Sequence, residues 1–219
     1  MKILDCTLRD GGYYNNWEFD KDLIKEYLKV MDDIKVDYVE IGFRFLDKIR
    51  TKGQCAYSDE SFLKSLKIPK NLKIGIMINA SDFVNSKDII SLAKKNFVHK
   101  KNSLISLVRI ACHYNEIKST VPLINWLKKS GYMVGVNIMQ IPELSFKDIK
   151  NSVIHIKKSK ADILYFADSL GSLNSEKTIK IIKKIRLFWN GPMGIHTHDN
   201  MGKALENSIS AIENSVEWI

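Results

Sequence analysis

The pair His196-Thr-His198 is the part of this sequence best suited to bind a metal ion. Residues two apart on a strand point to the same side, so both imidazoles can bind one cation. A carboxylate from a neighbouring strand, such as Asp10, would complete a set of nitrogen and oxygen donors with open positions for water and substrate. Such a set fits Mn²⁺, Mg²⁺, Fe²⁺, Co²⁺ or Zn²⁺, and we expect Mn²⁺ or Mg²⁺.

Arg9 and Asp10 lie side by side where the first predicted strand gives way to what we expect to be a glycine-hinged loop. One interpretation is a simple ion pair at the surface. If Asp10 instead binds a metal ion, Arg9 becomes a fork of hydrogen-bond donors beside it, well suited to a carboxylate or a developing enolate.

These residues need a scaffold, and short apolar runs alternate with amphipathic segments along the whole chain. We predict strands at 3–8, 38–43, 73–79, 104–111, 133–139, 162–168, 193–198 and 216–219. We predict helices at 20–34, 58–66, 81–95, 115–129, 145–158, 174–188 and 201–214. This alternation predicts a parallel sheet, closed or open. Because no glycine-rich nucleotide loop follows the first strand, we favour the closed (β/α)₈ TIM barrel.

Polar residues collect toward the carboxyl ends of the predicted strands, on the faces opposite the Val and Ile residues. Loops that build active sites leave a barrel from this end. Structural hydrogen bonding remains the alternative for single residues such as Asn79 or Asn137. The set is Asp10, Glu40, Asn79, Arg109, Asn137, Asp168, His196 and His198.

Composition restricts the class of protein. The 219 residues carry 34 Lys and Arg against 25 Asp and Glu, a net charge of +9 that favours anionic substrates. We expect one domain, 1–219, in the cytoplasm, with no nucleic-acid or membrane partner. Cys6, Cys55 and Cys112 are odd in number and widely spaced, so we expect neither a disulfide framework nor a thiolate metal site.

Five motifs in order carry a family resemblance: LDCTLRDGG, YVEIGF, VNIMQ, FADSLGSL and HTHDNMGKALENSISAIE. Together they resemble the metal-dependent aldolase and acyltransferase TIM barrels with a T-L-R-D-G motif. This superfamily includes 4-hydroxy-2-oxovalerate aldolase, hydroxymethylglutaryl-CoA lyase and isopropylmalate synthase. The resemblance covers nearly the whole chain.

The resemblance implies roles for individual residues. Asp10, His196 and His198 would hold the metal ion, and Arg9 would stabilise the enolate oxygen of a pyruvate-type substrate. Glu40 is similar to an acidic residue near the substrate in the lyases, and Asp168 would support the site from the loop after its strand. Our candidates for substrate binding are Arg9, Glu40, Arg109, Asn137 and Asp168.

Two departures from the family pattern affect the expectation. Tyr13 stands where the oxovalerate aldolases have a histidine base. We consider Tyr13, Tyr14 and His113 as candidate proton carriers, but for each we favour a structural interpretation, a packed aromatic side chain or a loop histidine. The chain also ends inside or just after the expected eighth strand, so we expect an incomplete barrel.

The implied activity is that of a divalent-metal-dependent aldolase or lyase acting through a metal-stabilised enolate of pyruvate or a related 2-oxo acid. Its partners would be a small anionic 2-oxo acid and an aldehyde, with a second copy of the chain or a dehydrogenase as candidate protein partners. The alternatives are a Claisen-type lyase or synthase using acyl-CoA, and a non-catalytic metal-binding remnant.

Overall fold

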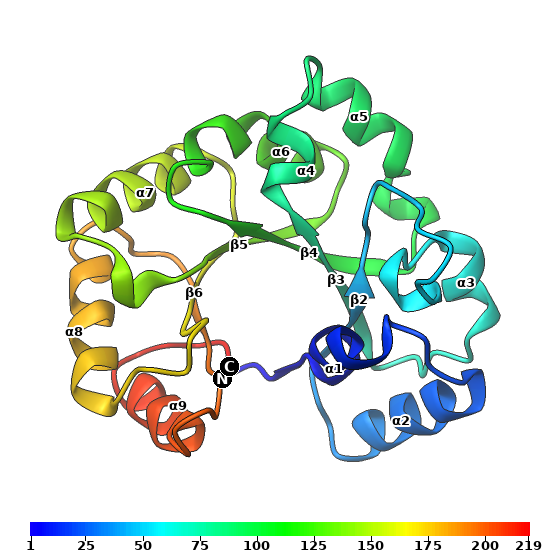
Figure 1. Ribbon diagram of the computed structural model, residues 1–219, viewed down its shortest axis with the longest axis horizontal. Helices are drawn as coiled ribbons and strands as arrows, with labels where there is room; N and C mark the ends of the chain where they lie inside the picture. Colours follow the sequence, from blue (N-terminus) through cyan, green and yellow to red (C-terminus); the bar gives the residue numbers. More distant parts are fainter.

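The computed structural model describes all residues, 1–219, as an α/β fold in which seven parallel strands are surrounded by helices, with a gap in the helical layer near the two termini (Figure 1). The strands follow one another around the sheet in chain order, each parallel to the next. They are β1 (Leu4–Asp5), β2 (Tyr38–Phe43), β3 (Lys73–Asn79), β4 (Ile105–Cys112), β5 (Met133–Ile138), β6 (Ile163–Ala167) and β7 (Met193–His196).

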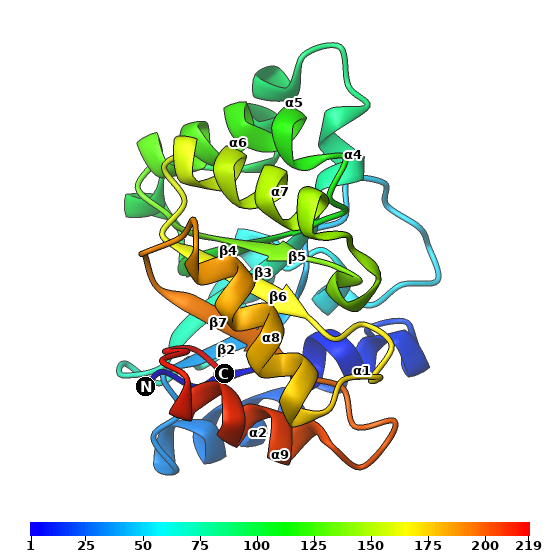
Figure 2. The ribbon, with the colours of Figure 1, turned by 90° about the vertical axis from the view of Figure 1, so that its left-hand side faces the viewer.

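Helices connect the strands and cover their outer faces. The α-helices are α1 (Thr7–Asn15), α2 (Lys21–Asp33), α3 (Glu60–Ser65), α4 (Ala80–Val84), α5 (Ile89–Asn96), α6 (Ile117–Lys129), α7 (Phe146–Lys158), α8 (Ser175–Arg186) and α9 (Ala204–Glu213). Three short 3₁₀ helices are η1 (Gln54–Ala56), η2 (Lys100–Asn102) and η3 (Ile141–Glu143). Figure 2 shows α1 at the end of the sheet toward which β5 and β6 point.

The last residues of the chain join the two edges of the sheet. Trp218 forms isolated bridges with Lys2 on one side and Gly194 on the other. The Leu4 amide donates to the Ile219 carbonyl (2.8 Å), and the Ile195 amide donates to the Trp218 carbonyl (3.0 Å). The predicted eighth strand therefore exists as a bridging segment between β1 and β7, and the two termini lie side by side (Figure 1).

The structure corrects two predicted elements. The first strand covers only Leu4–Asp5, and the expected loop after it is the helix α1. The predicted helix 81–95 is divided into α4 and α5, because Asp88 accepts hydrogen bonds from the Ile90 and Ser91 amides and so begins a new helix.

Strand residues alternate between two buried layers, as the predicted side-chain parity requires. The Val and Ile residues of β2, β3 and β5 lie in the large apolar core beneath the helices. A separate cluster, which we call the barrel plug, fills the interior. It consists of Leu4, Tyr38, Leu107, Ile163, Tyr165 and Trp218.

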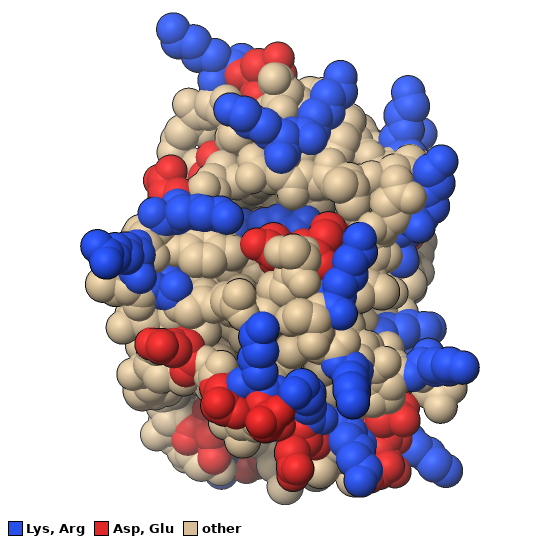
Figure 3. Space-filling view, turned by 90° about the vertical axis from the view of Figure 1, so that its right-hand side faces the viewer, with Lys and Arg blue, Asp and Glu red and all other residues tan.

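On the face drawn in Figure 3, Lys and Arg side chains are spread from top to bottom, and Asp and Glu lie among them, mainly in the lower half. None of the helices combines the length and the apolar character that a membrane span requires.

The barrel plug generates the first prediction. Trp218 is 7% exposed, and its ring centre lies 5.0 Å from that of Tyr38. Replacing Trp218 by Ala should lower the free energy of unfolding by about 3–5 kcal/mol, as for other buried aromatic residues. Urea denaturation would measure the change. The control Leu205→Ala, at a side chain 74% exposed, should change stability by less than about 0.5 kcal/mol. Equal small effects would show that residues 216–219 are not part of the folded core.

Candidate active site

The helix α1 places Arg9 and Asp10 at the carboxyl end of the sheet. It begins two residues after β1, so both side chains lie in or next to its first turn. Gly12, which we expected to be a hinge, has another function: a Cβ atom there would lie 1.9 Å from Cδ1 of Trp17. The glycine therefore permits a close approach between the helix and this indole.

Trp17 fixes α1 in place. Its backbone is left-handed (φ 56°), a rare conformation for a bulky residue, and its side chain is buried. The indole N–H donates to the Arg9 carbonyl (2.9 Å), and the ring centre lies 5.5 Å from that of Phe43 in β2. The indole thus ties the Arg9 backbone to the second strand.

The centre of the site is Glu40, whose side chain is fully buried between two arginines. Oε2 accepts from Arg9 Nε (2.8 Å) and from Arg109 Nη2 (2.9 Å), and Oε1 accepts from Arg109 Nε (2.8 Å). Burial by itself raises the pKa of Glu40, but the charges of Arg109 and Arg9 outweigh it and lower the pKa to about 2. Glu40 is therefore a permanent anion that orients both guanidinium groups.

Arg9 connects this buried group to the candidate metal ligands. Its Nη1 donates to Asp10 Oδ1, and its Nη2 lies 3.3 Å from Nε2 of His196. Arg9 is 4% exposed, so its contact with Asp10 is not the simple surface ion pair considered above. Partial burial by itself raises the pKa of Asp10, but the hydrogen bond with His196 and the charge of Arg9 outweigh it and hold the pKa below its ordinary value.

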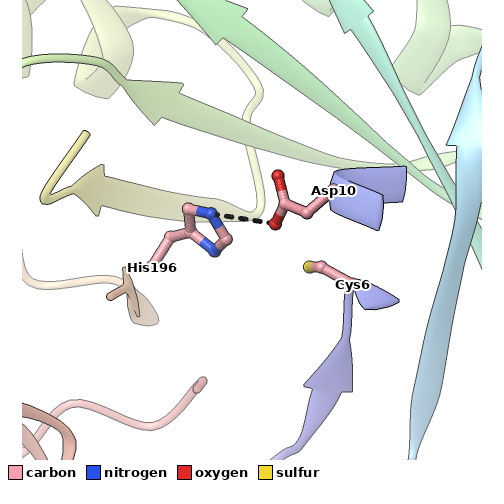
Figure 4. A group of neighbouring side chains, drawn as sticks. All are labelled: Cys6, Asp10 and His196. Carbon is pink, nitrogen blue, oxygen red and sulfur yellow. Dashed lines mark ion pairs between the residues drawn. The ribbon is translucent and has the colours of Figure 1, made fainter. Parts of the chain in front are cut away.

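His196 lies at the end of β7, and its Nε2 is 3.4 Å from Asp10 Oδ2 and 3.0 Å from Nε2 of His198 (Figure 4 shows the first of these contacts). Burial lowers the pKa of His196 to about 4, so the ring is neutral at pH 7 and one nitrogen carries a free electron pair. The predicted strand 193–198 ends at His196, so His198 lies beyond it, and strand alternation does not explain the position of its side chain. Its Nδ1 is 3.2 Å from the Ser169 carbonyl, which can only accept, so a hydrogen bond between them places a proton on Nδ1.

These donors fit a divalent ion. The structure gathers one carboxylate and two imidazole nitrogens, the donor types that Mn²⁺, Fe²⁺, Co²⁺ and Zn²⁺ accept. The Ser169 carbonyl behind His198 is the kind of partner that fixes the ring of a metal-binding histidine. His196 thus contacts both of the other predicted ligands, but no ion pair joins Asp10 to His198, and His198 is not among the residues whose donor atoms all lie within 4.8 Å of one another. The role of the three residues as ligands stays a prediction.

Cys6 was not predicted to take part, and the structure brings it to the same place. Its sulfur, a carboxylate oxygen of Asp10 and a ring nitrogen of His196 all lie within 4.8 Å of one another (Figure 4). Burial first, and then the charge of Glu40, raise the pKa of the Cys6 thiol to about 12. All three cysteines are free thiols. The sequence did not predict that Cys6 lies near Asp10, because only the turn from β1 into α1 brings the two residues together.

The remaining substrate-binding candidates differ in their surroundings. Asn137 is 3% exposed and its Oδ1 has no hydrogen-bond partner, which leaves this atom free for a ligand. Arg109 stacks over the Tyr165 ring at 4.7 Å, in space left by Gly135 and Gly194. A Cβ atom at Gly194 would lie 2.2 Å from that ring.

Asp168 is fully buried and holds the loop after β6. Its two carboxylate oxygens accept from the backbone amides of Ser172 (2.9 Å) and Leu173 (3.0 Å). Ser169, at the start of the same loop, contacts His198. The observed contacts of Asp168 are thus those of loop support, and its binding of substrate stays a prediction.

The three candidate proton carriers are not part of the ligand cluster. Tyr13 is 62% exposed, and its ring packs against Trp17 (4.9 Å between centres). Tyr14 is almost fully exposed, and His113 lies exposed after β4. The contact with Trp17 therefore supports the interpretation of Tyr13 as a packed aromatic side chain. A role of Tyr13 in proton transfer remains a prediction.

Gly12 generates a matched pair of variants. Gly12→Ala should lower the free energy of unfolding by about 1–3 kcal/mol, because the added carbon overlaps the Trp17 indole. In Gly11→Ala the added carbon meets only Phe19, at 3.8 Å, and better helix propensity should raise stability by about 0.5–1 kcal/mol. Urea denaturation of both variants checks the contrast. Similar effects at the two positions would argue against the close packing of α1 on Trp17.

Glu40 generates a prediction about stability and pH. Glu40→Gln leaves two buried cations without their anion and should cost about 3–5 kcal/mol at pH 7. Because the folded-state pKa is lowered, the charge of Glu40 stabilises the fold above its ordinary pKa of 4.5, and this contribution is lost as the pH falls toward 2. The stability difference between the two proteins should therefore shrink over that range. Glu176→Gln, at an exposed pair with Lys180, should show no measurable change. A pH-independent difference would contradict the assignment.

The comparisons with known proteins agree with the motifs. The family model described as HMGL-like matches residues 1–219. The N-terminal domain of a Bacteroides vulgatus protein, assigned by name to the aldolases, is 31% identical and superposes with a TM-score of 0.84 over 100% of this chain and 71% of that one.

Two curated relatives are more distant. The 4-hydroxy-2-oxovalerate aldolase of Geobacillus genomosp. 3 is 24% identical over 97% of this chain and 61% of the relative. The oxaloacetate decarboxylase of Mycobacterium tuberculosis is 20% identical over 99% of this chain and 62% of the relative. The chain thus spans about three fifths of the length of the curated relatives it matches. The match along its full length shows that the chain belongs to the HMGL-like family, whose named relatives include aldolases.

Proposed function

We propose that this chain is a divalent-metal-dependent aldolase or lyase that makes or breaks a carbon–carbon bond through the enolate of pyruvate or a related 2-oxo acid. The observation that carries the proposal is Arg9, which Glu40 holds with its guanidinium group against Asp10 and His196. A donor fixed in this way requires no rearrangement when negative charge develops on a substrate oxygen.

Asp10, His196 and His198 would hold the ion, and Mn²⁺ or Mg²⁺ remains the expectation from the sequence. The ion, when bound, supplies Lewis-acid stabilisation of negative charge on oxygen. Two arginines, Arg9 and Arg109, balance the carboxylates of Glu40 and Asp10 within the group. A site that also holds a divalent cation is therefore positive and attracts an anionic 2-oxo acid.

The chemistry of the relatives' named substrates supports this choice. Breaking the C3–C4 bond of a 4-hydroxy-2-oxo acid produces the enolate of pyruvate. Removing the distal carboxyl group of oxaloacetate produces the same species. Arg9 would donate to the enolate oxygen, and Asn137 would offer its free amide oxygen to a substrate donor group. Tyr13 is the candidate for moving a proton at its phenolic oxygen.

The second candidate is a Claisen-type lyase or synthase acting on an acyl-CoA thioester. The observation in its favour is the family description, HMGL-like, which refers to hydroxymethylglutaryl-CoA lyase. Turnover that requires a thioester would select this candidate. A protein that binds metal but turns over neither class of substrate would be a non-catalytic remnant of the family.

The proposal predicts separate effects for a charge donor and a ligand. Arg9→Ala should lower turnover of a 4-hydroxy-2-oxo acid by about 10²-fold or more, while the bound metal persists. His198→Ala should lose the metal as well. Pyruvate release, coupled to lactate dehydrogenase, measures turnover, and elemental analysis measures the metal. Arg50→Ala, at an exposed arginine after β2, serves as the control and should retain both. Equal metal loss in the Arg9 and His198 variants, or full turnover without Arg9, would contradict the proposal.

A further inference from the structure

Cys6 lies at the junction of β1 and α1 with its sulfur directed toward Asp10 and His196 (Figure 4). The three donor atoms lie within 4.8 Å of one another. Metal–ligand bonds are about 2.0–2.3 Å long, so two donors of one ion can lie up to about 4.6 Å apart, close to the separation observed here. The same three residues line a pocket of about 340 Å³ between β1 and β7, which gives a small ion access to them.

The surroundings of this sulfur differ from those of the other two cysteines. Arg109 Nη2 lies 3.6 Å from Cys6 Sγ, and its positive charge partly offsets the burial and the charge of Glu40, which together raise the pKa of this thiol. Cys55 and Cys112 are buried in the apolar core, and the Cys112 thiol lies 3.9 Å from the Thr120 hydroxyl. Cys6 is only partly buried.

We propose that Cys6 supplies a sulfur ligand to the ion held by Asp10 and His196, so that the site prefers a thiophilic divalent ion, Zn²⁺, Co²⁺ or Fe²⁺, over Mg²⁺. The inference rests on the proposed function, since it requires an ion at Asp10 and His196. When the sulfur binds, the S–H bond breaks, a sulfur–metal bond forms and one proton leaves to solvent, with no change in oxidation state. Thiolate is a soft donor, and Mg²⁺ prefers oxygen donors.

Co²⁺ is the probe for this ligand, because a cobalt–thiolate bond gives an intense charge-transfer absorption in the near ultraviolet. The wild-type protein titrated with Co²⁺ should show this band together with the weaker visible bands of bound cobalt. Cys6→Ser should lose the near-ultraviolet band, keep visible bands and bind Co²⁺ at least about 10-fold more weakly. The controls Cys55→Ser and Cys112→Ser should retain the band.

Thiol labelling of the wild-type protein provides a measurement that needs no variant. Cys6 is the least buried of the three cysteines, so we expect it to react first with a thiol reagent in the native state. Saturating Zn²⁺ should slow its labelling strongly, and Mg²⁺ should not. A labelling rate unchanged by Zn²⁺ would overturn the sulfur ligand.

The outcomes separate this inference from the proposed function. Visible cobalt bands without a near-ultraviolet band in the wild-type protein would overturn the role of Cys6 and leave the metal site of the proposed function in place. A near-ultraviolet band that persists in Cys6→Ser would do the same. Absence of any Co²⁺ binding to the wild-type protein would overturn both.

Discussion

The carboxylate of Glu40, shared between Arg9 and Arg109, is the interaction on which the rest of this site depends. It is fully buried and joins three separate parts of the chain: α1, β2 and β4. Removing two arginines from water is costly unless an anion compensates them, so both arginines depend on the charge of Glu40. With Nε occupied by Glu40, the two terminal nitrogens of Arg9 are left to contact Asp10 and His196.

This charged group also marks a boundary inside the sheet. On one side the barrel plug, with Tyr165 and Trp218, fills the interior with apolar and aromatic side chains. On the other side lie Asp10, His196 and His198, at the end of the sheet from which the loops leave. Along the strands, an apolar layer is thus followed by a layer of candidate ligands, and the two arginines connect these layers. Arg109 stacks on Tyr165 of the barrel plug, and Arg9 contacts His196 among the candidate ligands.

Much of the scaffold could be predicted from the sequence, because strand periodicity is local. The bounds of β2 and β3 and the inward position of Glu40 follow from alternation alone. The helix α1 could not be predicted, since its two glycines and charged residues resemble a loop until Trp17 packs against Gly12. The placement of Cys6 and the double pairing of Glu40 depend on strand register and on the turn after β1, and neither can be read from residue spacing.

The central claim is that this group of residues stabilises the enolate of a 2-oxo acid. Its most direct test is deuterium incorporation into the methyl group of pyruvate, measured by mass spectrometry in D₂O with the divalent ion bound to the protein, because this exchange requires the enolate and no aldehyde. The account predicts exchange well above that of the same ion in protein-free buffer. Exchange no faster than in that buffer, with the ion shown to be bound, would contradict it.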